Sequence, residues 1–209
     1  MEFSIKNYLF IVNISPQGFE MLRSDLKNSK VFVGISAGND SIKNDSYFFE
    51  GTEKYTSIVN NFKQISNNLE FKLLDFRIKG TVAQNILKTA DVIYLTGGDP
   101  LIQLQYMKEN GLDRIIKNFR GIIIGLSAGS MNQCRIAYYC KDEDILETMT
   151  YEGLGLVDVT ITPHYEIEND IQVNEHKKWS QQLPIIGLPN NSFIVVNNGL
   201  IEIYGKSHR

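Results

Sequence analysis

The chain has 209 residues, of which 43% are hydrophobic and 22% are charged, and such a chain can bury one sizeable core. Its net charge of −3, without a basic run, argues against a nucleic-acid partner. The apolar run Tyr8–Ile14 is too short to span a membrane, and no basic leader precedes it. We therefore expect a single cytoplasmic domain over residues 1–209.

The cysteine and histidine content bears on metals and cofactors. Cys134 and Cys140 have five residues between them, which does not match the close cysteine pairs of zinc sites. With three histidines in the chain, we expect free thiols, no metal site and no organic cofactor.

Short apolar runs alternate with longer amphipathic stretches along the chain. The predicted strands are rich in β-branched or aromatic residues and are bounded by Gly, Pro or Asn: Tyr8–Ile14, Val31–Ser36, Glu70–Asp75, Val92–Thr96, Gly121–Leu126, Val157–Thr162 and Ile185–Leu188. Helical periodicity marks Thr52–Ser66, Thr81–Ala90, Leu101–Phe119 with a break at Gly111, Ala128–Tyr138 and Asp170–Gln181.

This alternation predicts a fold class. Strands that alternate with helices form right-handed βαβ units, so we expect a three-layer α/β fold with a mostly parallel sheet flanked by helices on both faces. Sites in such sheets lie outside the carboxyl ends of the strands. The final stretch FIVVNNGLIEIYG has Asn-Gly between two apolar runs, which predicts a C-terminal antiparallel hairpin.

The pattern Gly-x-Ser-Ala-Gly occurs twice, around Ser36 and around Ser127. A nucleophile elbow needs a strand, a sharp turn and then a helix that begins at once. Ser127 follows the run IIIGL and precedes a helical stretch, whereas Ser36 precedes a polar loop. Ser127 is therefore the predicted nucleophile.

A serine nucleophile needs a base and a group that orients the base. His164 follows an alternating apolar run and Pro163, so we expect it at the same sheet edge as Ser127, unlike His176 on a helical face and His208 in the tail. The run KDED places Asp142, Glu143 and Asp144 between the two as candidate acids.

The turn after the strand Val92–Thr96 is a candidate for the oxyanion hole. Its residues Gly97 and Gly98 allow backbone N–H groups to approach a ligand closely. The alternative is an ordinary β-to-α turn before a helix that starts near Pro100.

Together these pieces resemble the peptidase E family. That family consists of serine dipeptidases specific for N-terminal aspartate, with cyanophycinase as a relative, on a fold similar to class I glutamine amidotransferases. The matching segments are GGD at 97–99, GLSAGS at 125–130 and PHY at 163–165, and the order of elements agrees over nearly the whole chain. The spacing from Ser127 also resembles that of the dipeptidases, which favours Asp142 over its two acidic neighbours.

Two features depart from related patterns. The family turn usually reads Gly-Gly-Asn, but Asp99 stands in this chain and would repel an acidic substrate side chain. The elbow residue is serine, whereas glutamine amidotransferases use cysteine, which argues against glutamine hydrolysis.

The resemblance implies a serine peptidase acting on small peptides. Ser127 would attack, His164 would transfer the proton and Asp142 would orient the imidazole, while the N–H groups of Gly98 and Ala128 would hold the oxyanion. Two further residues, Asp99 and Arg135, are candidate substrate contacts. A homodimer remains open, as do a non-catalytic binding protein on the same fold and an amidase or esterase using the same triad.

Overall fold

The computed structural model describes residues 5–38, 50–66, 68–141, 145 and 147–209. In chain order its elements are β1 (Lys6–Phe10), α1 (Pro16–Leu26), β2 (Val31–Ala37), α2 (Glu53–Ile65), β3 (Glu70–Leu74), α3 (Gly80–Leu87), β4 (Val92–Gly98), α4 (Pro100–Glu109), α5 (Leu112–Lys117), β5 (Ile122–Leu126), α6 (Ala128–Gln133), β6 (Ile136–Tyr139), β7 (Met149–Glu152), β8 (Thr160–Pro163), α7 (Asp170–Ser180), β9 (Ile185–Leu188), β10 (Phe193–Asn197) and β11 (Leu200–Tyr204).

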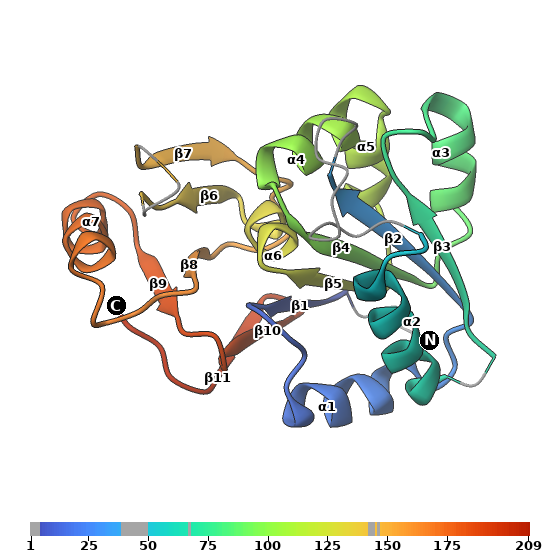
Figure 1. Ribbon diagram of the computed structural model, residues 1–209, viewed down its shortest axis with the longest axis horizontal. Coiled ribbons are helices and arrows are strands. Elements are labelled where there is room, and N and C mark those ends of the chain that lie inside the picture. The colour runs from blue at the N-terminus through green and yellow to red at the C-terminus, as the bar shows by residue number, and fades with distance from the viewer. Residues whose placement is uncertain (1–4, 39–49, 67, 142–144, 146) are drawn as a thin grey trace.

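A seven-stranded sheet forms the centre, in the order β11-β10-β1-β5-β4-β2-β3 (Figure 1). The five strands from β1 to β3 in this order run parallel, and β10 and β11 join antiparallel at the β1 edge. The C-terminal hairpin is thereby confirmed. Its turn has positive φ at Asn198 (49°) and Gly199 (83°), which a tight hairpin turn requires and which Asn-Gly supplies at little cost.

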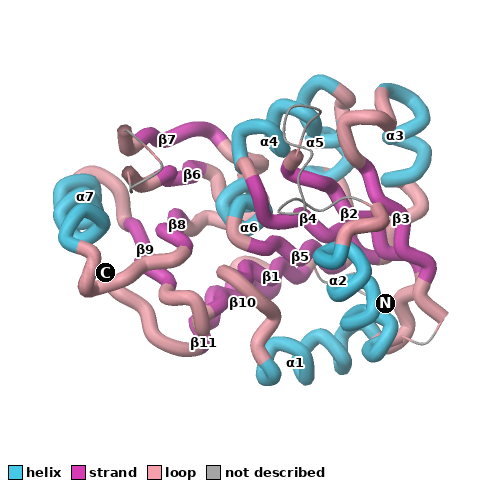
Figure 2. Tube along the Cα trace, viewed as in Figure 1, coloured by secondary structure: helices cyan, strands magenta, loops and turns pink. Residues whose placement is uncertain are grey.

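Helices cover both faces of this sheet (Figures 1 and 2). On one face, α1 and α2 pack Leu22, Leu26 and Phe62 against Phe32 and Tyr94 of the sheet. On the other, residues of α3, α4 and α5 join sheet residues in a second buried cluster that includes Leu87, Leu104, Ile116, Ile35 and Leu95. Each side chain buried in this way stabilises the fold by about 1.5–3 kcal/mol. Because helices pack on both faces of the sheet, the three-layer α/β prediction is confirmed.

The predicted strands Val157–Thr162 and Ile185–Leu188 do not join the central sheet. They form β8 and β9, which pair in parallel with each other. The short pair lies over β1 and β10, where Ile161 and Leu188 pack with Leu9 and Ile194. Their apolar residues are thus buried against a neighbouring sheet rather than inside it.

The predicted helix Ala128–Tyr138 is wrong over its second half. α6 ends at Gln133, Cys134 is extended and bridges to Val157, and Ile136–Tyr139 form β6. β6 pairs antiparallel with β7, which the sequence analysis did not predict. The run IAYY suits a strand because β-branched and aromatic residues favour one, and the partner strand supplies the hydrogen bonds that a longer helix would have made.

Among the described residues, no helix is both long enough and apolar enough to cross a membrane.

Candidate active site

Ser127 lies at the junction between β5 and α6, where the backbone is strained. Its φ and ψ of 46° and −104° are unusual for a residue with a Cβ atom. Three backbone hydrogen bonds hold the turn: Ser127 N–H donates to the Phe10 carbonyl at 2.9 Å, and the Ser127 carbonyl accepts from Ser130 at 2.9 Å and from Met131 at 3.0 Å. This is the geometry of a nucleophile elbow, which lifts the Oγ atom above the sheet.

Two glycines allow α6 to begin so close to the sheet. A Cβ atom on Gly129 would stand 2.1 Å from the Leu95 carbonyl oxygen of β4, and one on Gly125 would stand 2.4 Å from the Gln133 side chain. Neither position can take a side chain without displacement of backbone or helix. The small residues around Ser127 therefore set the position of the elbow as well as the shape of its turn.

His164 reaches the serine from β8. Its Nε2 atom lies 2.8 Å from Ser127 Oγ, within the range expected for a serine and its general base. His164 follows Pro163, the last residue of β8, and has a φ of 56°. The Tyr165 N–H donates to the Leu188 carbonyl of β9 at 3.1 Å, which anchors the chain immediately after the histidine.

The second imidazole nitrogen meets an amide. His164 Nδ1 lies 2.9 Å from Asn190 Oδ1. When Ser127 Oγ–H donates to Nε2, the proton of the neutral ring is on Nδ1 and the Asn190 oxygen accepts it. Asn190 thus favours the tautomer that a general base needs, without the negative charge that a carboxylate would supply.

Asn190 was missed by the sequence analysis, although a signal was present. β8 and β9 are parallel, with Pro163 opposite Leu188, so residues just beyond both strands meet at one edge. The argument that placed His164 after its strand applies equally to Asn190, two positions after Leu188.

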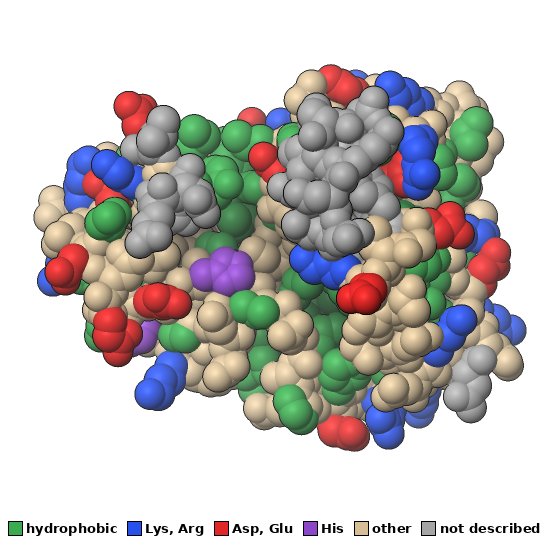
Figure 3. Space-filling model, viewed as in Figure 1, with side chains coloured by type: hydrophobic (Ala, Val, Ile, Leu, Met, Phe, Trp, Pro, Cys, Tyr) green, Lys and Arg blue, Asp and Glu red, His purple; other side chains and the backbone are tan. Residues whose placement is uncertain are grey.

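A cavity of about 250 Å³ opens at Ser127 and His164. In the space-filling view, histidine lies at a hollow bordered by hydrophobic side chains (Figure 3). Gly98 and Ala128, the predicted oxyanion donors, line the same cavity. Gly98 has a φ of 134°, a conformation that favours glycine, and Ala128 is the first residue of α6, where a helix leaves its N–H groups without internal partners.

A buried amide network joins the Gly98 turn to the elbow helix. Gln103 of α4 donates to the carbonyls of Ile35 and Thr96 at 2.9 and 3.1 Å, and its oxygen accepts from Asn132 of α6 at 3.0 Å. Asn132 also donates to the Pro100 carbonyl at 2.9 Å. Because both amides are fully buried, the network fixes the position of α6 relative to the end of β4 and the start of α4.

The other sequence-predicted residues lie elsewhere. Asp99 is the N-cap of α4, and its Oδ1 atom accepts from the N–H groups of Leu101 and Ile102 at 2.8 and 3.0 Å. Ser36 is 1% exposed within β2, and its Oγ accepts from the Gly38 N–H. The candidate acids Asp142, Glu143 and Asp144 lie outside the described residues.

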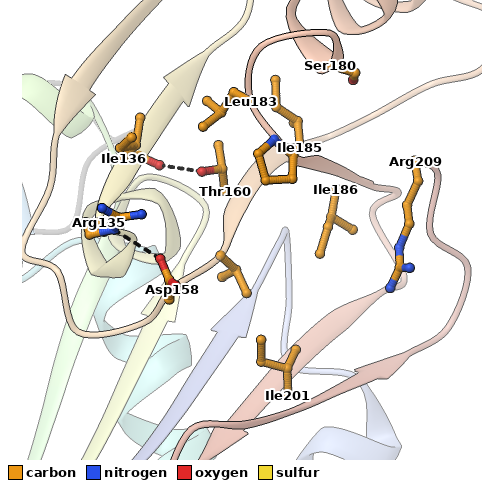
Figure 4. Close-up of a pocket in the computed structure, with 12 residues that line it drawn as sticks. Arg135, Ile136, Asp158, Thr160, Ser180, Leu183, Ile185, Ile186, Ile201 and Arg209 are labelled. Atoms are coloured by element: carbon orange, nitrogen blue, oxygen red, sulfur yellow. Dashed lines mark hydrogen bonds and ion pairs between the residues drawn. The ribbon is translucent and has the colours of Figure 1, made fainter.

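Arg135 is not brought to Ser127. Its side chain points toward Asp158 and forms an ion pair with it at 3.0 Å (Figure 4). Both line a different cavity, of about 460 Å³, between β6, β8 and β9. The expectation that Arg135 contacts substrate next to Ser127 thus finds no support in its position.

The site is of the serine hydrolase class: it has a parallel α/β fold and an elbow serine that is hydrogen-bonded to a histidine. Residues 50–204 match the profile described as Peptidase family S51. Because that match spans most of the chain, the protein belongs to peptidase family S51 and is a serine-type peptidase. The resemblance to the peptidase E family is confirmed.

Relatives of known sequence include the peptidase E of Nostoc sp., which is 23% identical over 220 residues, 96% of this chain and 86% of that protein. The peptidase E of Salmonella arizonae is 26% identical over 135 residues, 58% of each chain. A crystal structure of a candidate peptidase E protein from Listeria monocytogenes has a TM-score of 0.70 at 19% identity, covering 96% of this chain and 98% of that one. These similarities support the fold and the family.

Proposed function

We propose that this serine peptidase hydrolyses small peptides, with Ser127 as nucleophile and His164 as general base. The observation that carries the proposal is the 2.8 Å contact between Ser127 Oγ and His164 Nε2 at a strained elbow. The cavity of about 250 Å³ there is smaller than the 300–1,000 Å³ usual for drug-sized ligands, and so suits a short peptide segment.

The reaction follows from the positions of these groups. Ser127 Oγ attacks the scissile carbonyl carbon while His164 Nε2 takes its proton. The resulting oxyanion is held by the N–H groups of Gly98 and Ala128. Collapse breaks the C–N bond, and Nε2 returns the proton to the leaving amine. Water then cleaves the acyl–serine ester by the same transfers in reverse, with the proton of Nδ1 held by Asn190 throughout.

In this scheme Asn190 has the orienting role that the sequence analysis gave to Asp142. An amide oxygen accepts the Nδ1–H bond as a carboxylate does, but it stabilises the imidazolium less because it has no net charge. A modest turnover is expected for a serine peptidase with this arrangement.

A fluorophosphonate probe, which reacts with activated serines, tests the proposal. We expect labelling of the wild-type protein, loss of labelling and of dipeptide hydrolysis in Ser127→Ala, and a large loss of both in His164→Gln. Ser36→Ala is the matched control from the other Gly-x-Ser-Ala-Gly stretch and should be labelled like the wild type.

Absence of labelling and of hydrolysis in a folded wild-type protein would favour a non-catalytic binding role instead. Hydrolysis of simple esters without peptides would favour an esterase.

A further inference from the structure

The described residues that line the cavity at Ser127 include no Asp, Glu, Lys or Arg. Its described lining residues include apolar, aromatic and uncharged polar side chains: Pro100, Met131, Tyr138, Tyr139, Cys140, Ile145, Thr162, Pro163 and Gln172. His164 is the one histidine among the described lining residues. Burial raises the pKa of Tyr138 well above its usual range, with its hydrogen bond to Cys140 adding to this, so the Tyr138 phenol is neutral as well.

Charged residues of both signs adjoin the lining residues in sequence: Lys141 follows Cys140, whereas Asp99 lies between two lining residues. Asp99 stands between Gly98 and Pro100, which both line the cavity. Its carboxylate caps α4 by accepting hydrogen bonds from the N–H groups of Leu101 and Ile102. A substrate carboxylate that entered next to it would meet repulsion rather than a partner.

Gln172 is the longest uncharged polar side chain in this wall. It is 7% exposed, and its Oε1 atom accepts from the Glu166 N–H at 2.9 Å. Because that bond occupies the oxygen, the side-chain amide group can offer N–H to a substrate. A carboxylate there would gain at most an uncharged donor, which does not compensate for the loss of its hydration.

We propose that the substrate residue bound at this cavity carries a neutral side chain, apolar or amide-bearing, and that acidic residues are excluded. The inference rests on the proposed function and narrows its substrate class. This specificity would differ from that of an aspartyl dipeptidase. The uncharged lining and the carboxylate of Asp99 disfavour the substrate carboxylate that such an enzyme recognises.

A matched pair of substrates tests the charge alone. Asn-Leu and Asp-Leu dipeptides have first residues of nearly equal size that differ in charge, and Leu-Leu and Met-Leu extend the series to apolar side chains. We expect kcat/KM for Asn-Leu to exceed that for Asp-Leu at least 10-fold at pH 7.5. The same ratio should appear in the labelling rates of aminoacyl phosphonates with Asn or Asp side chains, which need the nucleophile but not turnover.

A variant that adds a cation to the wall supplies the reverse test. Gln172→Arg should lower the Asn-to-Asp ratio at least 5-fold, because a guanidinium would pair with the substrate carboxylate. Gln172→Met, of similar length and uncharged, should leave the ratio near its wild-type value even if overall activity falls.

The outcomes separate the two proposals. If fluorophosphonate labels Ser127 and Asp substrates or phosphonates react as fast as their Asn counterparts, the inference is overturned while the proposed function stands. If Ser127 reacts with none of these reagents in a folded protein, the proposed function fails and the inference fails with it. Labelling together with a clear preference for neutral residues supports both.

Discussion

At the scale of single residues, Asn190 sets the electrostatics of the candidate base. Its Oδ1 atom accepts the Nδ1–H bond of His164 at 2.9 Å but leaves the imidazolium without a countercharge among the contacts described. The hydrogen bond fixes the orientation of the ring.

Asn190→Asp would place a carboxylate next to Nδ1 of His164, where it favours the charged ring. The base must be neutral to work, so the acidic limb of the kcat/KM profile against pH should move to higher pH, while kcat on the plateau should rise. Asn190→Ala removes the hydrogen bond and should lower kcat about 10-fold or more. Identical pH profiles for wild type and Asn190→Asp would contradict a contact between these side chains in the working enzyme.

The buried environment of His176 leads to a prediction about how stability depends on pH. It is 3% exposed, its ring contacts that of Tyr165 with centroids 4.9 Å apart and planes tilted by 54°, and its Nε2 atom has no hydrogen-bond partner in the described part of the chain. Burial lowers the pKa of His176, and the charge of His208 lowers it further.

A lowered pKa in the folded state means that the unfolded chain binds the proton more readily. The free energy of unfolding should therefore decrease as the pH falls below about 6.5, the ordinary pKa of histidine. Urea unfolding at pH 7.5 and 5.5 measures this, and His176→Phe should lose less stability over that interval than the wild type. An equal loss in both proteins would show that other groups carry the pH dependence.

At the scale of elements, the elbow depends on how closely α6 approaches β4. Gly129→Ala would place a methyl group 2.1 Å from the Leu95 carbonyl oxygen, so the helix or the strand must move. We expect a loss of about 1–3 kcal/mol in the free energy of unfolding and a fall in kcat, because Ser127 is displaced with the helix.

Gly97→Ala is the matched stability control. Its added Cβ atom would meet the Leu126 carbonyl at 3.5 Å, an ordinary contact. Chemical denaturation of the two variants side by side should show the larger loss in Gly129→Ala. Equal stability of the two would mean that the close approach of α6 to β4 is readily relaxed.

At the element scale, some helix boundaries are set by local sequence and others by distant segments. Local capping explains α1, where Ser15 accepts from Gly18 and Pro16 occupies the first turn, but the sequence analysis predicted no helix there. The end of α6 at Gln133 could not be predicted locally, since it depends on the pairing of β6 with β7 and of Cys134 with Val157.

At the scale of the whole molecule, Arg135 and Ser127 belong to separate cavities. The Arg135–Asp158 pair is solvent-exposed, with side-chain exposures of 68% and 83%, and such pairs contribute at most about 1 kcal/mol. Arg135→Met should therefore change kcat/KM for small peptides less than about 2-fold and alter stability little. A drop of 10-fold or more in steady-state kinetics would restore Arg135 as a substrate contact.

The sequence by itself determined the α/β class, the hairpin at Asn198-Gly199 and the pairing of Ser127 with His164. The first two depend on local rules, namely periodicity and turn chemistry. The third was expected because both residues were placed at one sheet edge, but the structure brings His164 to Ser127 from the separate β8–β9 sheet. Only the tertiary structure decided that β8 and β9 form their own sheet, and that Asn190 meets the imidazole. Both depend on which distant segments pair, and pairing is set by the burial of apolar faces that no single stretch of sequence contains.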